Sequence, residues 1–591
     1  MDETSSKIGI PNKIVYSNSW LVALLLTGAL LTWSLYSVSL KGDFVFDDFN
    51  IIHDNAAIQS FPDPRPLLKS CQTRFLSHLS LSWNFYYGKF QPVYYHLFNL
   101  ALHFLNSILV LLLSALLWNA ANRKEKNSSF SQKLFCSLVF LGFLMHPVQA
   151  HAVNYISQRG TLLVAFFYLA SVYLFLRFRA TNKFQFKILS LASTICAMLT
   201  KETSFTIPVV IALADFTLYP QTRLEKRGRD LFPFLLCLLI IPVLLMVSLR
   251  AGQDIAGISM QTNLIPRHHY LFTQIHVIID YLRLLVFPAG QSIDYQYPLV
   301  TSLASPVTLT YLVTLVAAII WAVINIRRIP LMSFAILWFF ITLSVESSII
   351  PIDDVIQTYR LYLPSLGFLW LLAAGMEKIM LDHRLKILLA GTVLIFFSSF
   401  TLNRNILWQN EVTLLSDALQ KAPQKERIKL NLMRAYLRQG DFTNAYYLQT
   451  EIIPPELTDF SPWKEHELPG LPYEMLILNE IEKNNLQLAV LYARMAYWKC
   501  ENADILTALG SLMAWKNYNN LAYALFLKAL ALDNSLETAY LEFAKNLANF
   551  DNHTMAIRLL ELGLLQNPHS NALTDLKTAI RRIQEKQYVL R

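Results

Sequence analysis

Residues 97–118 read LFNLALHFLNSILVLLLSALLW and contain no Asp, Glu, Lys or Arg. An α-helix needs about 20 consecutive apolar residues to cross the roughly 30 Å hydrocarbon core of a bilayer. This stretch is long enough and apolar enough to do so. It therefore predicts a membrane-spanning helix.

Further apolar stretches fill most of the chain before residue 405. Together with 97–118, the following predict about eleven spans, the last three of them being shorter or interrupted: 21–40, 161–178, 231–249, 307–326, 331–350, 361–381, 385–402, 132–146, 186–200 and 204–219. The composition agrees, since 54% of the residues are hydrophobic and 15% are charged, whereas soluble domains are about a quarter charged. The first stretch is too long for a signal-peptide core and lacks a small-residue cleavage site, so we expect an anchor. The sequence predicts an all-α polytopic bundle.

The loops between these stretches differ in basic charge. Every second loop is rich in Lys and Arg, at 119–133, 177–187, 220–230, 327–328 and 378–386. The other short loops carry one basic residue each: Arg159, Lys201, Arg267 and Arg360. Basic loops stay on the cytoplasmic side. The positive charge of +9 is therefore explained by membrane topology, and no nucleic-acid partner is expected.

The segment 270–288 decides the sidedness of everything after it. Its sequence HYLFTQIHVIIDYLRLLVF contains His276, Asp280 and Arg283, which are costly at the centre of a membrane. A crossing here would also turn the later basic loops outward. We therefore predict a re-entrant or interfacial segment. The N-terminus is then cytoplasmic, and loop 41–95 and the C-terminal part lie on the opposite side.

The C-terminal part shows an internal repeat. Leu509-Gly510, Ala522, Phe526 and Ala529 recur as Phe543-Ala544, Ala556, Leu560 and Gly563, with the period of about 34 residues of helix–turn–helix tetratricopeptide repeats. Less regular units carry Tyr436, Gly440, Ala445 and Ile452, and then Ala489, Tyr492 and Ala496, with a proline-rich interruption at 453–473. We predict a cytoplasmic segment 1–18, a membrane domain 19–405 and a helical repeat domain 406–591. The repeat domain presents either a protein-binding surface or a packing module without a ligand.

Loop 41–95 begins with a cluster of acidic residues directly after the first span. Asp47 and Asp48 are adjacent, so repulsion between the carboxylates raises one pKa toward the range of a general base. The alternative is a solvated acidic loop. His53 follows in the same loop.

Four other polar groups fall on the same predicted face. His146 and His151 are five residues apart, a poor spacing for a metal pair on one helix face. Lys201 is followed by Glu202. The two side chains either form an ion pair, or the Lys201 ammonium is left to bind a phosphate. The guanidinium fork of Arg360 suits a phosphate; the alternative is a snorkelling interfacial arginine. Asp294 follows the segment 270–288.

Several signals are absent from the sequence. It contains no P-loop, Rossmann glycine motif, nucleophile elbow or zinc-spaced Cys/His set. The five cysteines form no metal-like pair. We therefore assign no metal-ligating residues, and an enzyme of this kind would take an activated substrate from the membrane.

The ordered motifs resemble those of a known family. FDDxxxIxxN, YHLxNxxLHxxN, HPVxxxAVxxIxxR, KETxxT, YLRLLxFPxxxSxDY, YRxYLPSxGF and RNxxWxNExxL occur in this order over about residues 40–570. They resemble the transmembrane-and-tetratricopeptide-repeat O-mannosyltransferases and their bacterial relatives, which are glycosyltransferases of the GT-C fold. One departure is His151, where those proteins usually carry an acidic residue.

The resemblance implies a polyprenyl-phosphate-linked sugar as donor, a protein acceptor and an outward-facing active site. The resemblance also implies that Asp47 or Asp48 is the general base of an inverting displacement. Arg360, Lys201 and Arg159 would bind the donor phosphate, and the remaining expected site-lining residues are His146, Glu202, His53 and Asp294. A requirement for a divalent metal is left open.

Two other functions stay open. One is a glycan polymerase or ligase of the same fold, and the other is a non-catalytic repeat-bearing scaffold for envelope or pilus assembly. In the scaffold the acidic pair is dispensable, whereas the repeats are not. We expect an integral protein of a bacterial inner membrane with its repeats in the periplasm.

Overall fold

The computed structural model describes residues 18–70, 72–122, 129–250, 265–348, 350–452 and 502–590, together with 477, 489–490, 492–493, 497 and 500. Within these residues every regular element is helical and no strand occurs. The chain divides into two compact units, Met1–Leu414 and Leu415–Arg591. Outside the described residues lie 1–17 of the predicted cytoplasmic segment, the interruption 453–473, and Cys71, Arg123, Lys124, Lys126 and Ala496.

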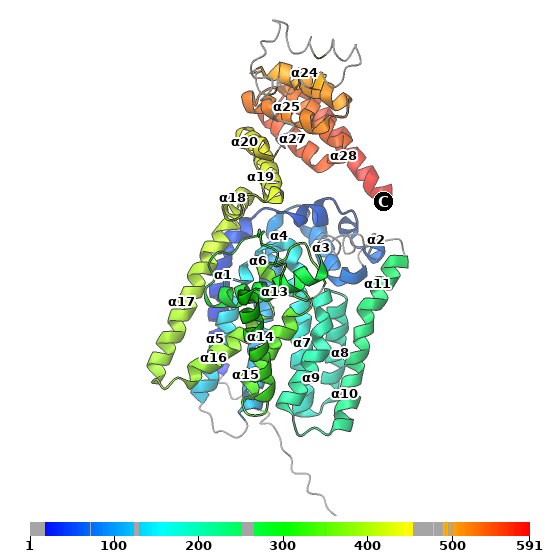
Figure 1. The fold of residues 1–591 in the computed structure, drawn as a ribbon. Coiled ribbons are helices and arrows are strands. Elements are labelled where there is room, and N and C mark those ends of the chain that lie inside the picture. The colour runs from blue at the N-terminus through cyan, green and yellow to red at the C-terminus, as the bar shows by residue number, and fades with distance from the viewer. Residues whose placement is uncertain are drawn as a thin grey trace, which may run out of the picture. The chain divides into compact units, whose positions relative to one another are not determined.

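The first unit is a bundle of helices (Figure 1). Its α-helices are α1 (Asn18–Tyr36), α2 (Arg65–Ser70), α3 (Phe75–Gly88), α4 (Pro92–Ala121), α5 (Ser129–Met145), α6 (Gln149–Asn154), α7 (Arg159–Thr181), α8 (Phe184–Met198), α9 (Ile207–Leu218), α10 (Leu224–Leu236), α11 (Ile240–Arg250), α13 (Arg267–Val286), α14 (Pro306–Ile324), α15 (Pro330–Leu343), α16 (Ser365–Lys378) and α17 (His383–Leu407). Short helical turns include η4 (Gln72–Arg74), η6 (Glu202–Thr206) and η8 (Thr358–Leu361).

Six helical stretches are long and apolar enough to cross a membrane: Ser19–Lys41, Pro92–Ala121, Ile156–Thr181, Leu224–Ser248, Pro306–Ile324 and His383–Leu407. The other five predicted spans also form helices, but shorter ones, of 12 to 17 residues: α5, α8, α9, α15 and α16. The sequence therefore predicted the all-α membrane bundle correctly. The length of each span was less well predicted, because turns such as η6 take residues from the helix ends.

The connections between helices define two ends of the bundle. One end, here called the loop-rich end, holds the connections α1–α4, α5–α7, α8–α9, α13–α14 and α15–α16. The other, here called the basic end, holds α7–α8, α9–α10, α14–α15 and α16–α17. The residues predicted for the active site all belong to the loop-rich end.

Helix α13 lies along the loop-rich end. Near its start, the Tyr270 hydroxyl donates to the Glu346 carbonyl (2.9 Å). Near its end, His146 Nε2 lies 2.9 Å from the Leu285 carbonyl oxygen. Both contacts are with residues of the loop-rich end, so α13 does not run to the basic end. This agrees with the prediction that segment 270–288 does not cross.

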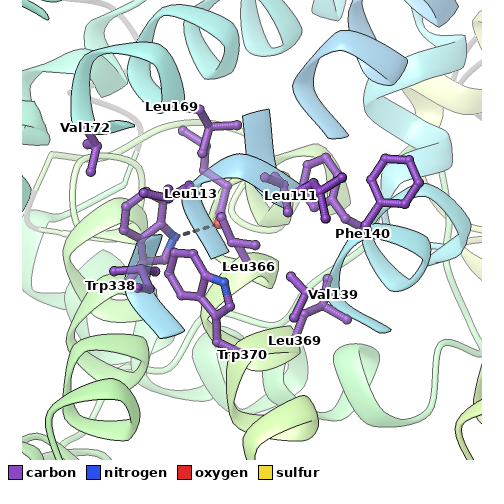
Figure 2. Packing of buried hydrophobic residues seen from close by; sticks show 14 of the residues in the cluster. Leu111, Leu113, Val139, Phe140, Leu169, Val172, Trp338, Leu366, Leu369 and Trp370 are labelled. Carbon is purple, nitrogen blue, oxygen red and sulfur yellow. Dashed lines mark hydrogen bonds between the residues drawn. The ribbon is translucent and has the colours of Figure 1, made fainter. Parts of the chain in front are cut away.

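The core of the bundle is aromatic and aliphatic (Figure 2). Trp338 of α15 and Trp370 of α16 pack edge to face, with ring centroids 5.1 Å apart. Trp338 Nε1 donates to the Leu363 carbonyl (2.9 Å), so its one polar group is satisfied in the interior. Gly142 allows α5 to approach α16, because a Cβ there would lie 2.9 Å from Leu369.

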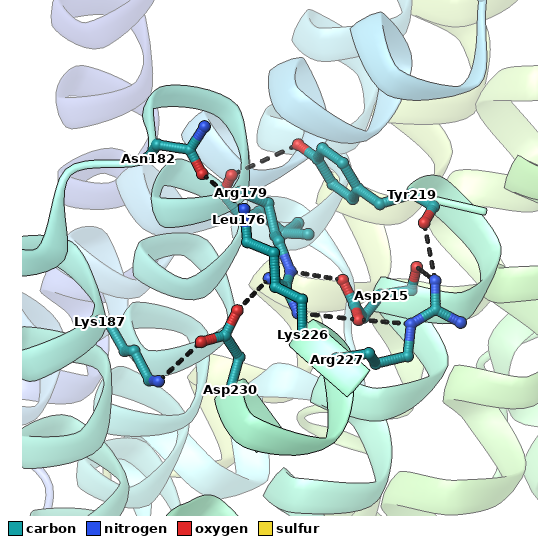
Figure 3. A network of polar contacts seen from close by, with 9 residues as sticks. All are labelled: Leu176, Arg179, Asn182, Lys187, Asp215, Tyr219, Lys226, Arg227 and Asp230. Carbon is teal, nitrogen blue, oxygen red and sulfur yellow. Dashed lines mark hydrogen bonds and ion pairs between the residues drawn. The ribbon is translucent and has the colours of Figure 1, made fainter. Parts of the chain in front are cut away.

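A buried ion-pair network joins four helices at the basic end (Figure 3). Arg179 donates to Asp215 (2.6 Å) and Asp230 (2.5 Å). Arg227 also contacts Asp215 (2.9 Å), and Lys187 contacts Asp230 (2.8 Å). Three of the basic residues that indicated the cytoplasmic side are therefore fixed in the protein rather than free in loops.

The second unit consists of helical hairpins. Its helices are α19 (Glu426–Gln439), α20 (Phe442–Ile452), α24 (Ala503–Trp515), α25 (Asn519–Leu532), α26 (Glu537–Asn549), α27 (His553–Gln566) and α28 (Asn571–Leu590), and α18 (Glu411–Lys421) spans the boundary between the units. The hairpins α24–α25 and α26–α27 begin 34 residues apart, at 503 and 537. The repeat requires a small residue at position 510, because a Cβ on Gly510 would lie 2.7 Å from the Phe526 ring. The predicted period is confirmed for these two hairpins.

Candidate active site

The two adjacent aspartates after α1 have different environments. Asp48 is buried, and its carboxylate accepts the backbone N–H of Val45 (3.1 Å) and of Ser157 (2.7 Å). Asp47 is exposed, and its backbone N–H donates to the Tyr155 hydroxyl (3.1 Å). The loop after α1 is thus fixed to the segment before α7, and only one carboxylate of the pair faces solvent.

The protonation of Asp48 reflects this burial. Burial raises the pKa of Asp48 to about 7, although the N–H groups of Val45 and Ser157 lower it, and the charge of Asp47 adds to the rise. Because its oxygens are held by the backbone, Asp48 positions the loop. Asp47 is the carboxylate that a substrate can reach.

Two ion pairs lie at the loop-rich end. Lys201 Nζ contacts Glu346 (2.9 Å) and donates to Thr161 Oγ1 (3.0 Å). Arg74 donates two hydrogen bonds to Glu202, at 3.0 Å each. Burial opposes ionisation of both glutamates, but Lys201 and Arg74 lower their pKa values. One interpretation of the sequence was that Lys201 and Glu202 pair with each other. The structure instead gives each of them a partner from elsewhere in the chain.

Tyr359 connects these charges to Asp47. The Lys201 ammonium lies 5.2 Å from the centre of the Tyr359 ring. Burial raises the pKa of Tyr359, the charge of Arg360 lowers it, and the charges of Glu346 and Asp47 raise it further. The charges of Arg360, Glu346 and Asp47 therefore act on the Tyr359 phenol, and Lys201 contacts its ring.

Arg360 also holds its own loop. Its guanidinium donates to the carbonyl oxygens of Val355 (3.1 Å) and Asp354 (2.6 Å). It is buried, and its charge contributes to lowering the pKa of Glu346. The structure thus places a fixed positive charge beside the Lys201 pair.

His151 lies in an aromatic environment in the same region. Its Nδ1 is 2.7 Å from Thr358 Oγ1. Its ring packs on Tyr359 and Trp408, with centroids 5.1 and 5.5 Å apart. Burial holds the pKa of His151 well below its ordinary value. The position is therefore neutral, in contrast to the acidic residue that the resemblance implied.

Arg159 is placed differently from the sequence prediction. It is fully buried and donates to Asn99 (2.8 Å), to the Tyr95 carbonyl (2.9 Å), to the Ser80 carbonyl (3.2 Å) and to Asn84. These bonds use each guanidinium nitrogen. The residue ties α3 and α4 to α7, and we leave it out of the phosphate site.

Three further predicted residues stabilise the surrounding loops. His146 is buried, with Nε2 on the Leu285 carbonyl oxygen (2.9 Å). The His53 ring stacks on Phe90 with centroids 4.4 Å apart. The Asp294 carbonyl accepts the Ser292 hydroxyl (2.6 Å) in a buried turn.

Sequence reasoning missed several residues of this region. Glu346 is an acidic residue at the end of an apolar stretch, which is a signal for function and could have been used. Arg74, Tyr155 and Tyr359 carry no such signal, since only the fold brings them close. No group of three or more metal-binding side chains that could hold an ion occurs among the described residues.

Comparison with known proteins supports the resemblance. The chain is 26% identical over 420 residues to protein O-mannosyl-transferase F38B6.6 of Caenorhabditis elegans, an alignment that covers 67% of this chain and 57% of that protein. It is 23% identical over 474 residues to protein O-mannosyl-transferase TMTC3 of Homo sapiens, covering 71% and 50% of the two chains. The mouse TMTC3 protein gives the same identity and shares.

These relatives carry the name of the family that the ordered motifs indicated, so that resemblance is confirmed. The chain spans about half the length of the curated relatives it matches. No protein-family model matches the sequence, and no solved structure matches it. The apolar helices and these relatives together identify an integral membrane protein.

Proposed function

We propose that this protein is a membrane glycosyltransferase that moves a sugar from a polyprenyl-phosphate donor to a hydroxyl group of a protein acceptor. The reaction takes place at the loop-rich end, on the non-cytoplasmic side of the membrane. In a bacterial cell this is the periplasmic side of the inner membrane. The relatives named O-mannosyl-transferases support the reaction class.

The observation that carries the proposal is that Asp47 and Asp48 have different environments. The Asp48 carboxylate is buried on two backbone N–H groups, and Asp47 is left exposed in a fixed position beside Tyr155. A general base must be positioned and reachable. Asp47 satisfies both conditions, and Asp48 supplies the positioning.

The proposed step is a single displacement. Asp47 takes the proton of the acceptor hydroxyl, whose oxygen attacks the anomeric carbon. The bond between that carbon and the phosphate oxygen breaks, and the lipid phosphate leaves with the electron pair. Positive charge where negative charge develops lowers the barrier, so we assign Lys201 and Arg360 to the departing phosphate. No step is assigned to a metal.

The second unit is proposed to hold the acceptor. Its helical hairpins have the period of modules that bind peptides on an extended surface. Tethering an acceptor chain raises its effective concentration at the site. The described helices α24–α27 support this assignment through their regular packing.

The test is complementation of a strain that lacks the gene. Wild-type protein, Asp47→Asn and the control Asp63→Asn are compared at matched membrane levels. Asp63 is a suitable control because it lies in the same loop, is partly exposed and pairs with the exposed Arg65. Intact-mass measurement of envelope proteins reads out transfer.

We expect a hexose-sized mass increment on at least one protein with wild type and Asp63→Asn, and its loss with Asp47→Asn. Normal transfer by Asp47→Asn would refute the assignment of the base. An unchanged mass profile in the gene-deleted strain would refute protein glycosylation and favour the scaffold or the glycan ligase.

A further inference from the structure

Helix α3 lies between the ends of two membrane-spanning stretches. The turn η4, directly before α3, contacts α11, which belongs to the span Leu224–Ser248. Four residues after α3 ends, α4 begins the span Pro92–Ala121. Fourteen residues of helix extend about 21 Å at 1.5 Å per residue. Both ends of α3 are thus held at the loop-rich end, at the level where these two spans leave the membrane.

The inward side of α3 is partly polar. Ser77, Ser82 and Asn84 are buried there, beside the apolar Leu81 and Phe85. Asn84 and the Ser80 carbonyl accept hydrogen bonds from Arg159 of α7. In a water-facing surface helix, the polar stripe would point outward and the apolar stripe inward. In α3, the inward side instead carries polar groups, of which the Asn84 side chain and the Ser80 carbonyl accept hydrogen bonds from Arg159.

The outward side of α3 is aromatic. Trp83, Tyr86 and Tyr87 follow the i, i+3, i+4 spacing of one helix face and are 43%, 44% and 65% exposed. The Trp83 and Tyr87 rings lie 5.2 Å apart. Tyr94, in the first turn of α4, is 45% exposed. We call these four residues the aromatic face.

The aromatic face continues into the exposed side of α4. Leu97 and Leu105 are 40% and 45% exposed, and they share one face of α4 with Tyr94. Because α4 is a candidate span, this stripe is exposed to lipid chains. Tyr and Trp are enriched where a bilayer meets water, because each ring has an apolar body and a polar tip.

We propose that α3 is an interfacial helix whose aromatic face binds the outer leaflet of the bilayer at headgroup depth. Its inner side carries the Arg159 contacts, and its N-terminal end carries Arg74, the partner of Glu202. The membrane surface therefore supports one wall of the candidate site from outside. This inference concerns lipid contact and holds or fails independently of the proposed reaction.

The test uses the full chain in phosphatidylcholine–phosphatidylglycerol vesicles. The five native cysteines are replaced by Ala or Ser. One reporter cysteine is introduced by Tyr87→Cys and, in a separate protein, by Asn50→Cys as the control. Asn50 is exposed and lies in the same external loop. Each is labelled with the fluorophore NBD and quenched either by aqueous iodide or by lipids that carry a nitroxide near the headgroup.

We expect the label at position 87 to be quenched by the nitroxide lipid and at least threefold less by iodide than the label at position 50. Iodide quenching equal to that at position 50, without nitroxide quenching, would overturn the proposal. That result would mean that the aromatic face contacts water. Because Tyr87 is mostly exposed, its replacement removes little internal packing.

Discussion

The substitution Arg159→Met separates a structural from a substrate-binding role for the buried arginine. It removes hydrogen bonds to the side chains of Asn84 and Asn99 and to the carbonyls of Ser80 and Tyr95. The two carbonyls lie in helices and keep their in-helix partners. The two amide oxygens become buried acceptors without this donor, at about 1–3 kcal/mol each.

The expected loss of stability is therefore about 2–6 kcal/mol. Removal of a buried charge offsets part of it, and Met fills most of the volume, so we expect a net loss of about 2 kcal/mol or more. Addition of Asn84→Leu should recover part of that loss, because one of the orphaned oxygens is then gone. Such non-additivity is expected of residues in direct contact.

The assay is thermal unfolding of detergent-purified protein, followed by a thiol-reactive fluorophore. Cys71, Cys196 and Cys500 are replaced by Ser. The remaining Cys136 and Cys237 are buried thiols outside any disulfide, so they react only when the bundle opens. We predict a lower unfolding temperature for Arg159→Met and partial recovery in the double variant. An unchanged unfolding temperature together with a raised KM for the lipid-phosphate donor would refute the reasoning and return Arg159 to the phosphate site.

Three other predictions follow from individual contacts. Burial raises the pKa of Asp48 in the folded protein from 3.8 to about 7, so between these pH values the folded loop binds a proton that the unfolded loop has lost. The stability of the loop therefore falls as pH rises through 7. Proteolysis of the loop should be faster at pH 8 than at pH 6, and Asp48→Asn should remove this difference. Glu346→Gln frees Lys201 from its counter-charge and should lower the KM for the lipid-phosphate donor, whereas Lys201→Met should raise it; equal KM values in steady-state transfer assays would contradict the assignment. Gly510→Leu must displace the Phe526 ring and should cost about 1–3 kcal/mol, seen as faster limited proteolysis of the second unit, with the unfolding temperature reported by Cys136 unchanged.

Much of the fold follows from local sequence patterns. Apolar stretches predicted the helices of the bundle, six of which are long enough to span, and the 34-residue spacing predicted the hairpins α24–α25 and α26–α27. The polar residues His276, Asp280 and Arg283 indicated that α13 does not cross, because charge at mid-membrane is costly. These signals act over a few turns of helix and are therefore readable along the chain.

The site was less predictable, because its contacts join distant segments. Adjacency in sequence suggested equal roles for Asp47 and Asp48, but the Ser157 N–H that binds Asp48 is supplied by another loop. Lys201 and Glu202 are neighbours, yet each pairs with a residue more than 100 positions away. Side-chain chemistry predicted that these residues matter, and only tertiary structure assigns their partners.

The central claim is that the loop-rich end, with its acidic loop, faces away from the cytoplasm together with the repeat unit. Its most direct test is labelling of single cysteines in intact spheroplasts by a membrane-impermeant maleimide. Asn50→Cys reports on the acidic loop, Leu565→Cys on the second unit, and Arg229→Cys on the basic end; all three positions are exposed. We predict labelling at 50 and 565 in intact spheroplasts, and at 229 only after permeabilisation. Labelling of 229 in intact spheroplasts, or protection of 50 or 565, would contradict the account.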